Sequence, residues 1–321
     1  MTDRRKCMEK LPKNYIFDTD MDTDCDDAAA LVLLIKNMPA DGKLLAVVTD
    51  VPSRNAPGAC EAILRYNGAD APVGTIYDDE FPEDRTDRYV KYRAHVRSLP
   101  DGLYYNRVLA GKLGKTDRDY RPSAEVYREA LSKAADGSVT VIVVGFMTAI
   151  EQLWLTGPDA WSELDGYELF RRKVAAVVSM GNAEYPRGDD NIFNYQMDAI
   201  GAYEFFKRCP CPVYMSPDGW TIVTGMTFTD RLKSDDPVRI SYEMYNGGEH
   251  KGRMSWDLIT TLFAIGIRDD LFTVKTHGTA RYDAETDEMY WEDGPREDYI
   301  VHAKISDTEL TGILEDLVAG E

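Results

Sequence analysis

Short, wholly apolar runs alternate along this chain with longer segments that are apolar on one face only. The apolar runs predict buried strands, and the amphipathic segments predict helices packed against them. One strand is expected to end at Asp18, and further strands are expected at 43–50, 72–76, 138–145, 173–181 and 211–216. Helices are expected to begin near Asp26 and to cover 57–69, 123–135, 148–155, 198–209, 255–267 and 307–319. This alternation predicts an α/β fold with a mostly parallel, doubly wound, Rossmann-like sheet that is flanked by helices.

The same pattern predicts a single domain over residues 1–321, because it contains no internal repeat and no linker. It weakens over 78–122, where a strongly charged start and a short helix at 89–99 predict an insertion resembling a lid over an active site. Beyond Pro217 the alternation loosens again, and 217–321 is expected to elaborate the domain, with hairpin character over about 272–303.

The charge balance narrows the classes of partner. The chain has 37 basic and 56 acidic residues, a net charge of −19, which argues against nucleic acid and membrane surfaces as partners. No apolar run reaches the roughly eighteen residues of a membrane span, and no signal-peptide pattern is present, so we expect a cytoplasmic protein. A chain whose leader had been removed would have the same pattern. The five cysteines are irregularly spaced and predict no disulfide framework.

One stretch concentrates acidic residues between a buried strand and a buried helix. Six aspartates fall within ten residues, at positions 18, 20, 22, 24, 26 and 27. Carboxylates this close repel one another unless protons or a cation intervene, and a hard divalent cation prefers such oxygen ligands. The carboxyl ends of parallel strands are also where ligands bind. The alternative is a solvated acidic turn whose last aspartates only cap the helix.

Three other places offer oxygen ligands at predicted strand ends or helix starts. They are 49–55 (TDVPSRN), 145–148 (GFMT) and Asp257. Neighbouring strand ends in a doubly wound sheet converge on one crevice, so we expect these groups to approach the acidic turn despite their separation in sequence.

These motifs resemble those of the inosine/uridine-preferring nucleoside hydrolases. The segment IFDTDMDTDCDDAAALVLL resembles that family's N-terminal signature in its longer-spacer form, DTD-x-G-x-D-x-DDA, with Asp22 in place of the glycine. VVTDVPSRN, VVGFMTAI, VVSMGNAEYP, FNYQMDAIGAYEFF and SWD follow in the family's order. The resemblance therefore covers about residues 15–267.

The resemblance implies a Ca²⁺-dependent hydrolysis of the N-glycosidic bond of a nucleoside or related riboside, as in purine and pyrimidine salvage, by a homodimer or homotetramer. The implied metal ligands are Asp20, Asp27, the backbone carbonyl of Thr148, and Asp257. Asp20 would be the general base, Asp26 would contact the ribose, and Asn55 and Asn194 would flank it. Ca²⁺ takes six to eight oxygen ligands, so carboxylates, a carbonyl, a water and a sugar diol form a chemically complete set. A carboxylate base also suits a water that is only weakly acidified.

The chain departs from the family pattern at three positions. Ile192 replaces a glutamate, for which Asp190 or Asn191 would have to substitute, and Ala149 replaces an asparagine. Trp256 replaces a histidine that is associated with protonating the leaving purine, so the base specificity stays open. Trp256 either stacks on a base or sugar face or packs in the core.

The longer acidic turn leaves two further assignments open. Asp24 is a rival to Asp20 as base or ligand. Asp18 and Asp20 also fit the nucleophile and the acid/base of a Mg²⁺-dependent phosphatase of the haloacid-dehalogenase type, although that alternative gives Asp27 and Asp257 no role. A calcium-binding loop of the EF-hand type fails in every register, because neither its glycine nor its glutamate is present. A catalytically inactive riboside-binding protein is the remaining alternative.

Overall fold

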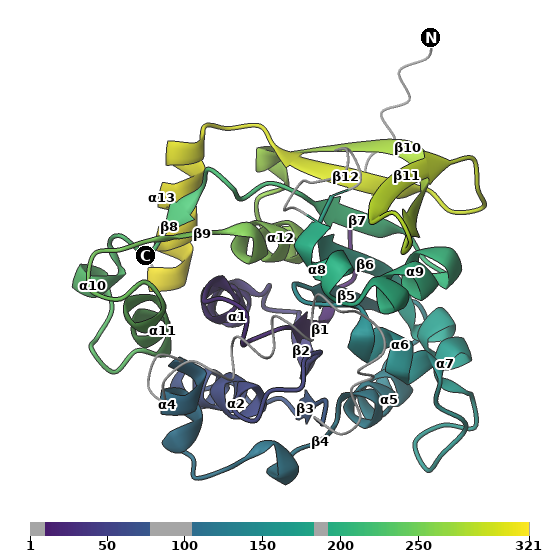
Figure 1. Ribbon diagram of the computed structural model, residues 1–321, viewed down its shortest axis with the longest axis horizontal. Coiled ribbons are helices and arrows are strands. Elements are labelled where there is room, and N and C mark those ends of the chain that lie inside the picture. Colours follow the sequence, from purple (N-terminus) through teal and green to yellow (C-terminus); the bar gives the residue numbers. More distant parts are fainter. Residues whose placement is uncertain (1–9, 78–104, 183–191, 321) are drawn as a thin grey trace.

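The computed structural model describes residues 10–77, 105–182 and 192–320, and these form one large sheet with helices on both faces (Figure 1). The strand order is β11-β10-β12-β7-β6-β5-β1-β2-β3-β4. Its strands are β1 (Asn14–Thr19), β2 (Lys43–Thr49), β3 (Val73–Thr75), β4 (Arg121–Pro122), β5 (Val139–Val143), β6 (Val174–Met180), β7 (Val213–Ser216), β10 (Phe272–Asp283), β11 (Glu288–Glu292) and β12 (Asp298–Ala303). β8 (Val223–Thr224) and β9 (Arg253–Met254) form a separate antiparallel pair.

Most neighbouring strands are parallel, and the chain winds outward from β1 in both directions. β1 pairs in parallel with β2 on one side and with β5 on the other. In the described part of this sheet, the edge strand β11 pairs antiparallel with β10, and β10 also pairs antiparallel with β12. The order reverses between β1 and β5, and such a switch point is where doubly wound sheets bind ligands. The predicted α/β class and doubly wound topology are confirmed.

The helices cover the two faces of the sheet in two groups (Figure 1). α1, α2, α12 and α13 pack on one face, and α5, α6, α7 and α9 pack on the other. Their bounds, with those of the remaining helices, are α1 (Asp26–Asn37), α2 (Ala56–Tyr66), α4 (Tyr105–Gly111), α5 (Ser123–Lys133), α6 (Thr148–Trp154), α7 (Gly166–Lys173), α8 (Phe193–Met197), α9 (Ala199–Arg208), α10 (Phe228–Arg231), α11 (Pro237–Tyr245), α12 (Trp256–Ile265) and α13 (Asp307–Ala319).

α1 and α12 are the central helices of their layer, and their sequences explain why. Residues 28–34 of α1 are all apolar and fully buried or nearly so. α12 is buried along its whole length and ends at Gly266, whose φ of 65° is the left-handed C-terminal conformation that glycine adopts without strain. A helix that is apolar on every side must be enclosed by other elements. The two helices therefore pack directly on each other, which brings their N-termini together.

Most elements predicted from the sequence are present within two or three residues of their expected bounds. Five of the described helices were not predicted, namely α4, α7, α8, α10 and α11. The expected hairpin in the tail is β10–β11, and β12 also joins the main sheet beside β7. Of the expected insertion at 78–122, residues 105–122 hold α4, which packs on α2, and the edge strand β4. The rest of it, including the predicted helix at 89–99, lies outside the described residues.

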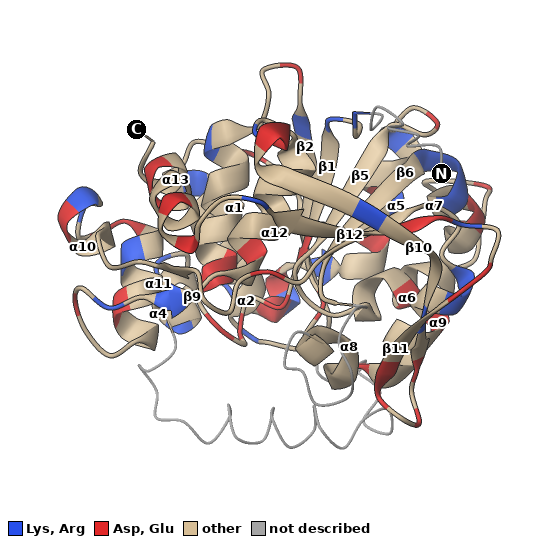
Figure 2. Cartoon of the chain, turned by 90° about the horizontal axis from the view of Figure 1, so that it is seen from above, with Lys and Arg blue, Asp and Glu red and all other residues tan. Residues whose placement is uncertain are grey.

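Charged residues of both signs are spread over many elements (Figure 2). In that view the described Lys and Arg residues occupy several separate helices and strands. None of the helices in the described ranges is long and apolar enough to cross a bilayer.

Candidate active site

A cavity of about 420 Å³ lies at the switch point, where β1 and β5 end and α1 and α12 begin. Its lining combines five aspartates, several aromatic side chains and one arginine. The charged lining residues are Asp20, Asp24, Asp26, Asp27, Asp257 and Arg253, and the aromatic ones are Phe193, Trp220, Tyr245 and Trp256. The cavity is therefore acidic at its base and has an apolar, aromatic wall.

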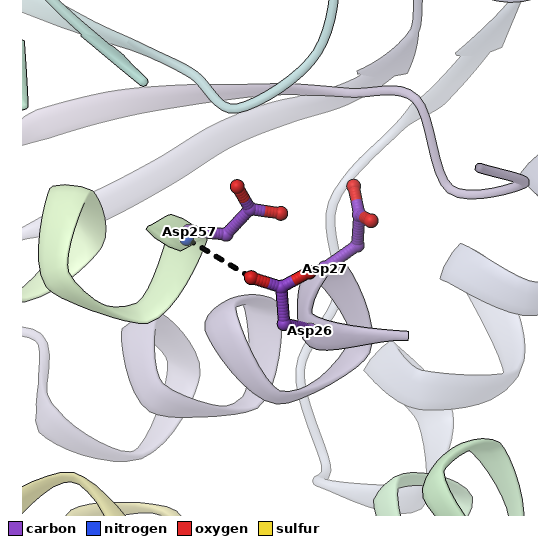
Figure 3. A group of neighbouring side chains, drawn as sticks. All are labelled: Asp26, Asp27 and Asp257. Carbon is purple, nitrogen blue, oxygen red and sulfur yellow. Dashed lines mark hydrogen bonds between the residues drawn. The ribbon is translucent and has the colours of Figure 1, made fainter. Parts of the chain in front are cut away.

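Three carboxyl groups meet at the base of this cavity (Figure 3). Asp26 and Asp27 open α1, Asp257 lies in the first turn of α12, and one oxygen of each lies within 4.8 Å of the others. One oxygen of Asp26 accepts hydrogen bonds from the backbone N–H groups of Trp256, at 3.0 Å, and Asp257, at 3.2 Å. Asp26 thereby caps α12, as a carboxylate at a helix N-terminus does. Residues 230 positions apart thus form one cluster.

Asp20 follows β1 and lines the same cavity. Burial raises the pKa of Asp20 to about 8; the Thr23 hydroxyl, which donates to it at 2.5 Å, opposes this, and the nearby charges of Asp24 and Asp26 add to it. At neutral pH and without a cation, this carboxyl group therefore keeps its proton.

Asp27 and Asp257 are in the same electrostatic situation. Burial raises the pKa of each well above its usual range, and the neighbouring carboxylates raise both further. Thr19 donates a hydrogen bond to Asp27. Several buried carboxyl groups with mutual repulsion form the donor set of a hard divalent cation, which would allow all of them to ionise. The residues present therefore fit a hard divalent cation.

Asp24 has a different environment from the other aspartates of the turn. One of its oxygens pairs with the guanidinium of Arg253, whose Nε lies 2.7 Å away, and the other accepts from the backbone N–H groups of Cys25 and Asp26. Both oxygens are thus in use. This leaves Asp20, rather than Asp24, as the carboxylate of the turn available for a proton transfer.

Asp18 lies beneath the cavity and is not one of its lining residues. It is fully buried, accepts a hydrogen bond of 2.5 Å from the Tyr127 hydroxyl, and lies against the equally buried Asp50. Burial raises the pKa of Asp18 to about 7 and that of Asp50 well above its usual range. A Cβ at Gly145 would collide with the Asp50 carboxyl group and with the backbone nitrogen of Asp20, so only glycine fits there.

The burial of Asp18 bears on the phosphatase alternative. A nucleophilic aspartate must reach its substrate, whereas Asp18 is sealed by Tyr127 and by the sheet. The geometry therefore does not support an aspartyl-phosphate mechanism at this position.

The remaining residues named from the sequence fall into three groups. Asn194 and Trp256 line the cavity, and the amide nitrogen of Asn194 donates to the Val144 carbonyl at 2.7 Å. Asn55 precedes α2, and Thr148 begins α6 with its hydroxyl on Asp198 at 2.6 Å; neither is among the lining residues. Asp190 and Asn191 lie outside the described residues.

Several residues of the site or its support were not singled out from the sequence; they include Thr23, Asp50, Tyr127, Phe193, Trp220, Tyr245 and Arg253. Asp50 lies in the segment 49–55, which was noted for its oxygen groups. Arg253 lies four residues before Asp257, and a lone cation so close to an expected acidic site is the signal that was available.

No protein-family model matches the chain, and no curated protein matches it by sequence. Solved structures do match. An inosine-uridine preferring nucleoside hydrolase from Bacillus anthracis is 17% identical with a TM-score of 0.62, and the match covers 96% of this chain and 100% of that one. A purine-preferring ribonucleoside hydrolase from Gardnerella vaginalis is 15% identical with a TM-score of 0.63, covering 96% and 98%. The type III effector XopQ, solved in complex with adenosine diphosphate ribose, is 16% identical with a TM-score of 0.70, covering 96% and 94%.

These likenesses run over nearly the whole length of each chain. At this level of identity they establish the fold. The protein has the nucleoside-hydrolase fold, as the resemblance of its motifs implied.

Proposed function

We propose that this protein is a Ca²⁺-dependent N-ribohydrolase that cleaves a nucleoside or related riboside to free ribose and a base. The observation that carries the proposal is the convergence of the buried Asp26, Asp27 and Asp257, with Asp20 beside them, in one cavity at the switch point of a nucleoside-hydrolase fold. Nucleoside hydrolases are named among the structures that share this fold, which supports the same reaction class here.

Asp20, Asp27 and Asp257 would hold the cation. The backbone carbonyl of Thr148, which is not among the lining residues, is proposed as a further ligand from the resemblance alone. When bound, the ion supplies a positive charge that acidifies a water molecule and orients the sugar hydroxyls. The free oxygen of Asp26 is available to the ribose, since its other oxygen is used to cap α12. Asn194, fixed by the Val144 carbonyl, would bind the ribose from the opposite wall. Asn55 is proposed as a further ribose contact from the resemblance alone.

Asp20 is the proposed general base. It is buried beside the other carboxylates, and its hydrogen bond from Thr23 fixes the orientation of its carboxyl group. It would take one proton from the attacking water while the bond between C1′ and the base nitrogen breaks. The oxocarbenium-like charge that develops on the ribose is stabilised by the neighbouring carboxylates.

The test is a screen of purine and pyrimidine nucleosides for release of free ribose, with chelator and after adding back Ca²⁺ or Mg²⁺. We expect release that chelator abolishes and Ca²⁺ restores. Release that is unaffected by chelator would contradict the metal dependence. Release of phosphate from a phosphate ester, with none of ribose, would contradict the reaction class.

A riboside-binding protein without hydrolytic activity is the second candidate. Ile192 and Ala149, which replace polar residues of the family pattern, are both buried in the apolar core to which α6 and α9 also contribute. XopQ shows that a protein of this fold is found with a ribosyl ligand, adenosine diphosphate ribose. Calorimetric binding of ribose or adenosine diphosphate ribose, without release of free ribose from any nucleoside, would favour this candidate.

A further inference from the structure

Arg253 is the only cationic side chain among the described residues that line the cavity, where it faces five aspartates. The loop geometry explains how it is held. β9 pairs with β8, Arg253 lies opposite Thr224, and the chain turns through Ser255 into α12. Its backbone is therefore fixed by a strand pair and by the start of the helix that carries Asp257.

The guanidinium group is oriented by three contacts. Nε and Nη2 pair with one oxygen of Asp24, at 2.7 and 2.5 Å. The planar group also lies near the rings of Tyr245, at 5.4 Å, and Trp256, at 5.5 Å. Stacking of this kind favours a guanidinium over an ammonium group. The second terminal nitrogen, Nη1, has no hydrogen-bond partner among the described residues, so its two N–H groups are available to a ligand.

Arg253 is the one permanently charged donor that the described lining residues offer to a departing base. None of its described lining residues is a histidine or a lysine. When an N-glycosidic bond breaks, both bonding electrons go to the base nitrogen. The base of an uncharged nucleoside therefore departs as an anion unless an acid protonates it, and a hydrogen-bond donor can stabilise that anion. An arginine does not donate its proton at physiological pH, but it does stabilise developing negative charge through hydrogen bonds.

We propose, on the basis of the function proposed above, that Arg253 is the catalytic residue that stabilises the leaving base as its negative charge develops. The C1′–nitrogen bond breaks with its electron pair going to the base, and the water oxygen bonds to C1′. Asp20 takes the proton of that water, and the departing base anion is held by the N–H groups of Arg253 until it takes a proton from solvent.

The same arrangement limits the class of substrate. A ligand that is already an anion at the base position would meet five carboxyl groups and one guanidinium that is partly neutralised by Asp24. The effect of Arg253 is therefore confined to neutral ribosides whose base leaves as an anion with acceptor atoms for its N–H groups. A riboside whose base leaves as a neutral molecule gains nothing from Arg253.

The experiment compares Arg253→Gln with the wild type on two substrates, uridine and nicotinamide riboside, whose pyridine base leaves uncharged. The readout is kcat from free ribose in the presence of Ca²⁺. Loss of one preorganised donor to a developing anion costs on the order of 10²–10³ in rate, and we expect that loss on uridine with less than about threefold on nicotinamide riboside. Arg268→Gln, at an exposed pair with Asp270, is the matched control and should change neither rate.

Arg253→Lys serves as the second variant if Arg253→Gln does not fold. The lysine keeps the positive charge but loses the planar, two-pronged guanidinium group. Relative to the wild type, its kcat on uridine should fall less than that of the glutamine variant. Its kcat on uridine should also fall more than its kcat on nicotinamide riboside. The pH profile on uridine should also show no loss of rate at high pH from a leaving-group acid. Equal losses of kcat on both substrates would show that Arg253 only holds Asp24 in position. That result would overturn this inference and leave the proposed function standing. A wild type that releases ribose from neither substrate overturns the proposed function and this inference with it.

Discussion

Removing the cation from the proposed site is expected to make the stability of this protein fall as pH rises. Burial raises the pKa of Asp20 from 3.8 to about 8 when no ion is present. Between these values the folded chain keeps a proton that the unfolded chain has released. The folded state therefore binds more protons than the unfolded state, and the free energy of unfolding decreases with increasing pH in that window.

The magnitude follows from the pKa shift. Each pH unit inside the window costs about 1.4 kcal/mol per proton, so Asp20 alone contributes a loss of about 3 kcal/mol between roughly pH 5 and 7.5. For a chain of 321 residues this corresponds to a fall in Tm of about 5 °C. Asp27 and Asp257, whose pKa values are also raised, act in the same direction.

A bound divalent cation takes the place of these protons. The rise in Tm caused by saturating Ca²⁺ should therefore grow with pH, from almost nothing near pH 5 to several degrees near pH 7.5. Asp18 titrates in the same range but lies outside the cavity, so its effect persists with and without Ca²⁺ and cancels in this difference.

The assay is calorimetry or dye-monitored melting in chelator and in Ca²⁺ over that pH range. Asp20→Asn, which cannot titrate, should reduce the slope measured in chelator by the share of Asp20, whereas Asp41→Asn, at an exposed carboxylate paired with Lys13, should leave it unchanged. A Tm in chelator that stays level or rises with pH, together with no effect of Ca²⁺, would refute the reasoning.

Three other substitutions test single parts of the account. Asp257→Asn should abolish the Ca²⁺-induced rise in Tm. The chelated protein should become no less stable, because a neutral amide replaces a carboxyl group that is disfavoured in its charged form; a normal Ca²⁺ response in a melting assay contradicts this. Asp20→Asn should lower kcat by about 10²–10⁴ with little change in KM, and a wild-type kcat for ribose release would remove Asp20 as the base. Tyr127→Phe removes the donor to the buried Asp18, and urea unfolding should show a loss of about 1–3 kcal/mol in the free energy of unfolding, with kcat nearly unchanged. A large fall in kcat with an unchanged free energy of unfolding would be evidence against a supporting role.

The fold was predictable from the sequence because its central elements are apolar without interruption. β5 is buried at every position, and α1 is buried over its apolar stretch, so both patterns are unambiguous. α7 and α11 were missed since each buries only a few residues. Their start signals were nevertheless present, as Asp165 accepts from the N–H of Glu168 and Asp236 accepts from that of Val238.

The acidic cluster was predictable in kind, because carboxylates at strand ends and helix starts of a doubly wound sheet must converge. The separate contacts that each aspartate makes within the cluster were not predictable. Asp26 caps α12 through the backbone of Asp257, and Asp24 is occupied by Arg253. Both contacts join segments more than 200 positions apart, and they depend on how β9 and α12 approach the turn, which no local pattern encodes.

The most direct test of the central claim is an anomalous diffraction experiment on crystals grown with Ca²⁺. The account predicts one ion in the cavity, about 2.3–2.6 Å from carboxylate oxygens of Asp20, Asp27 and Asp257. A cavity without an ion at saturating Ca²⁺, or an ion held only by exposed carboxylates elsewhere, would contradict it.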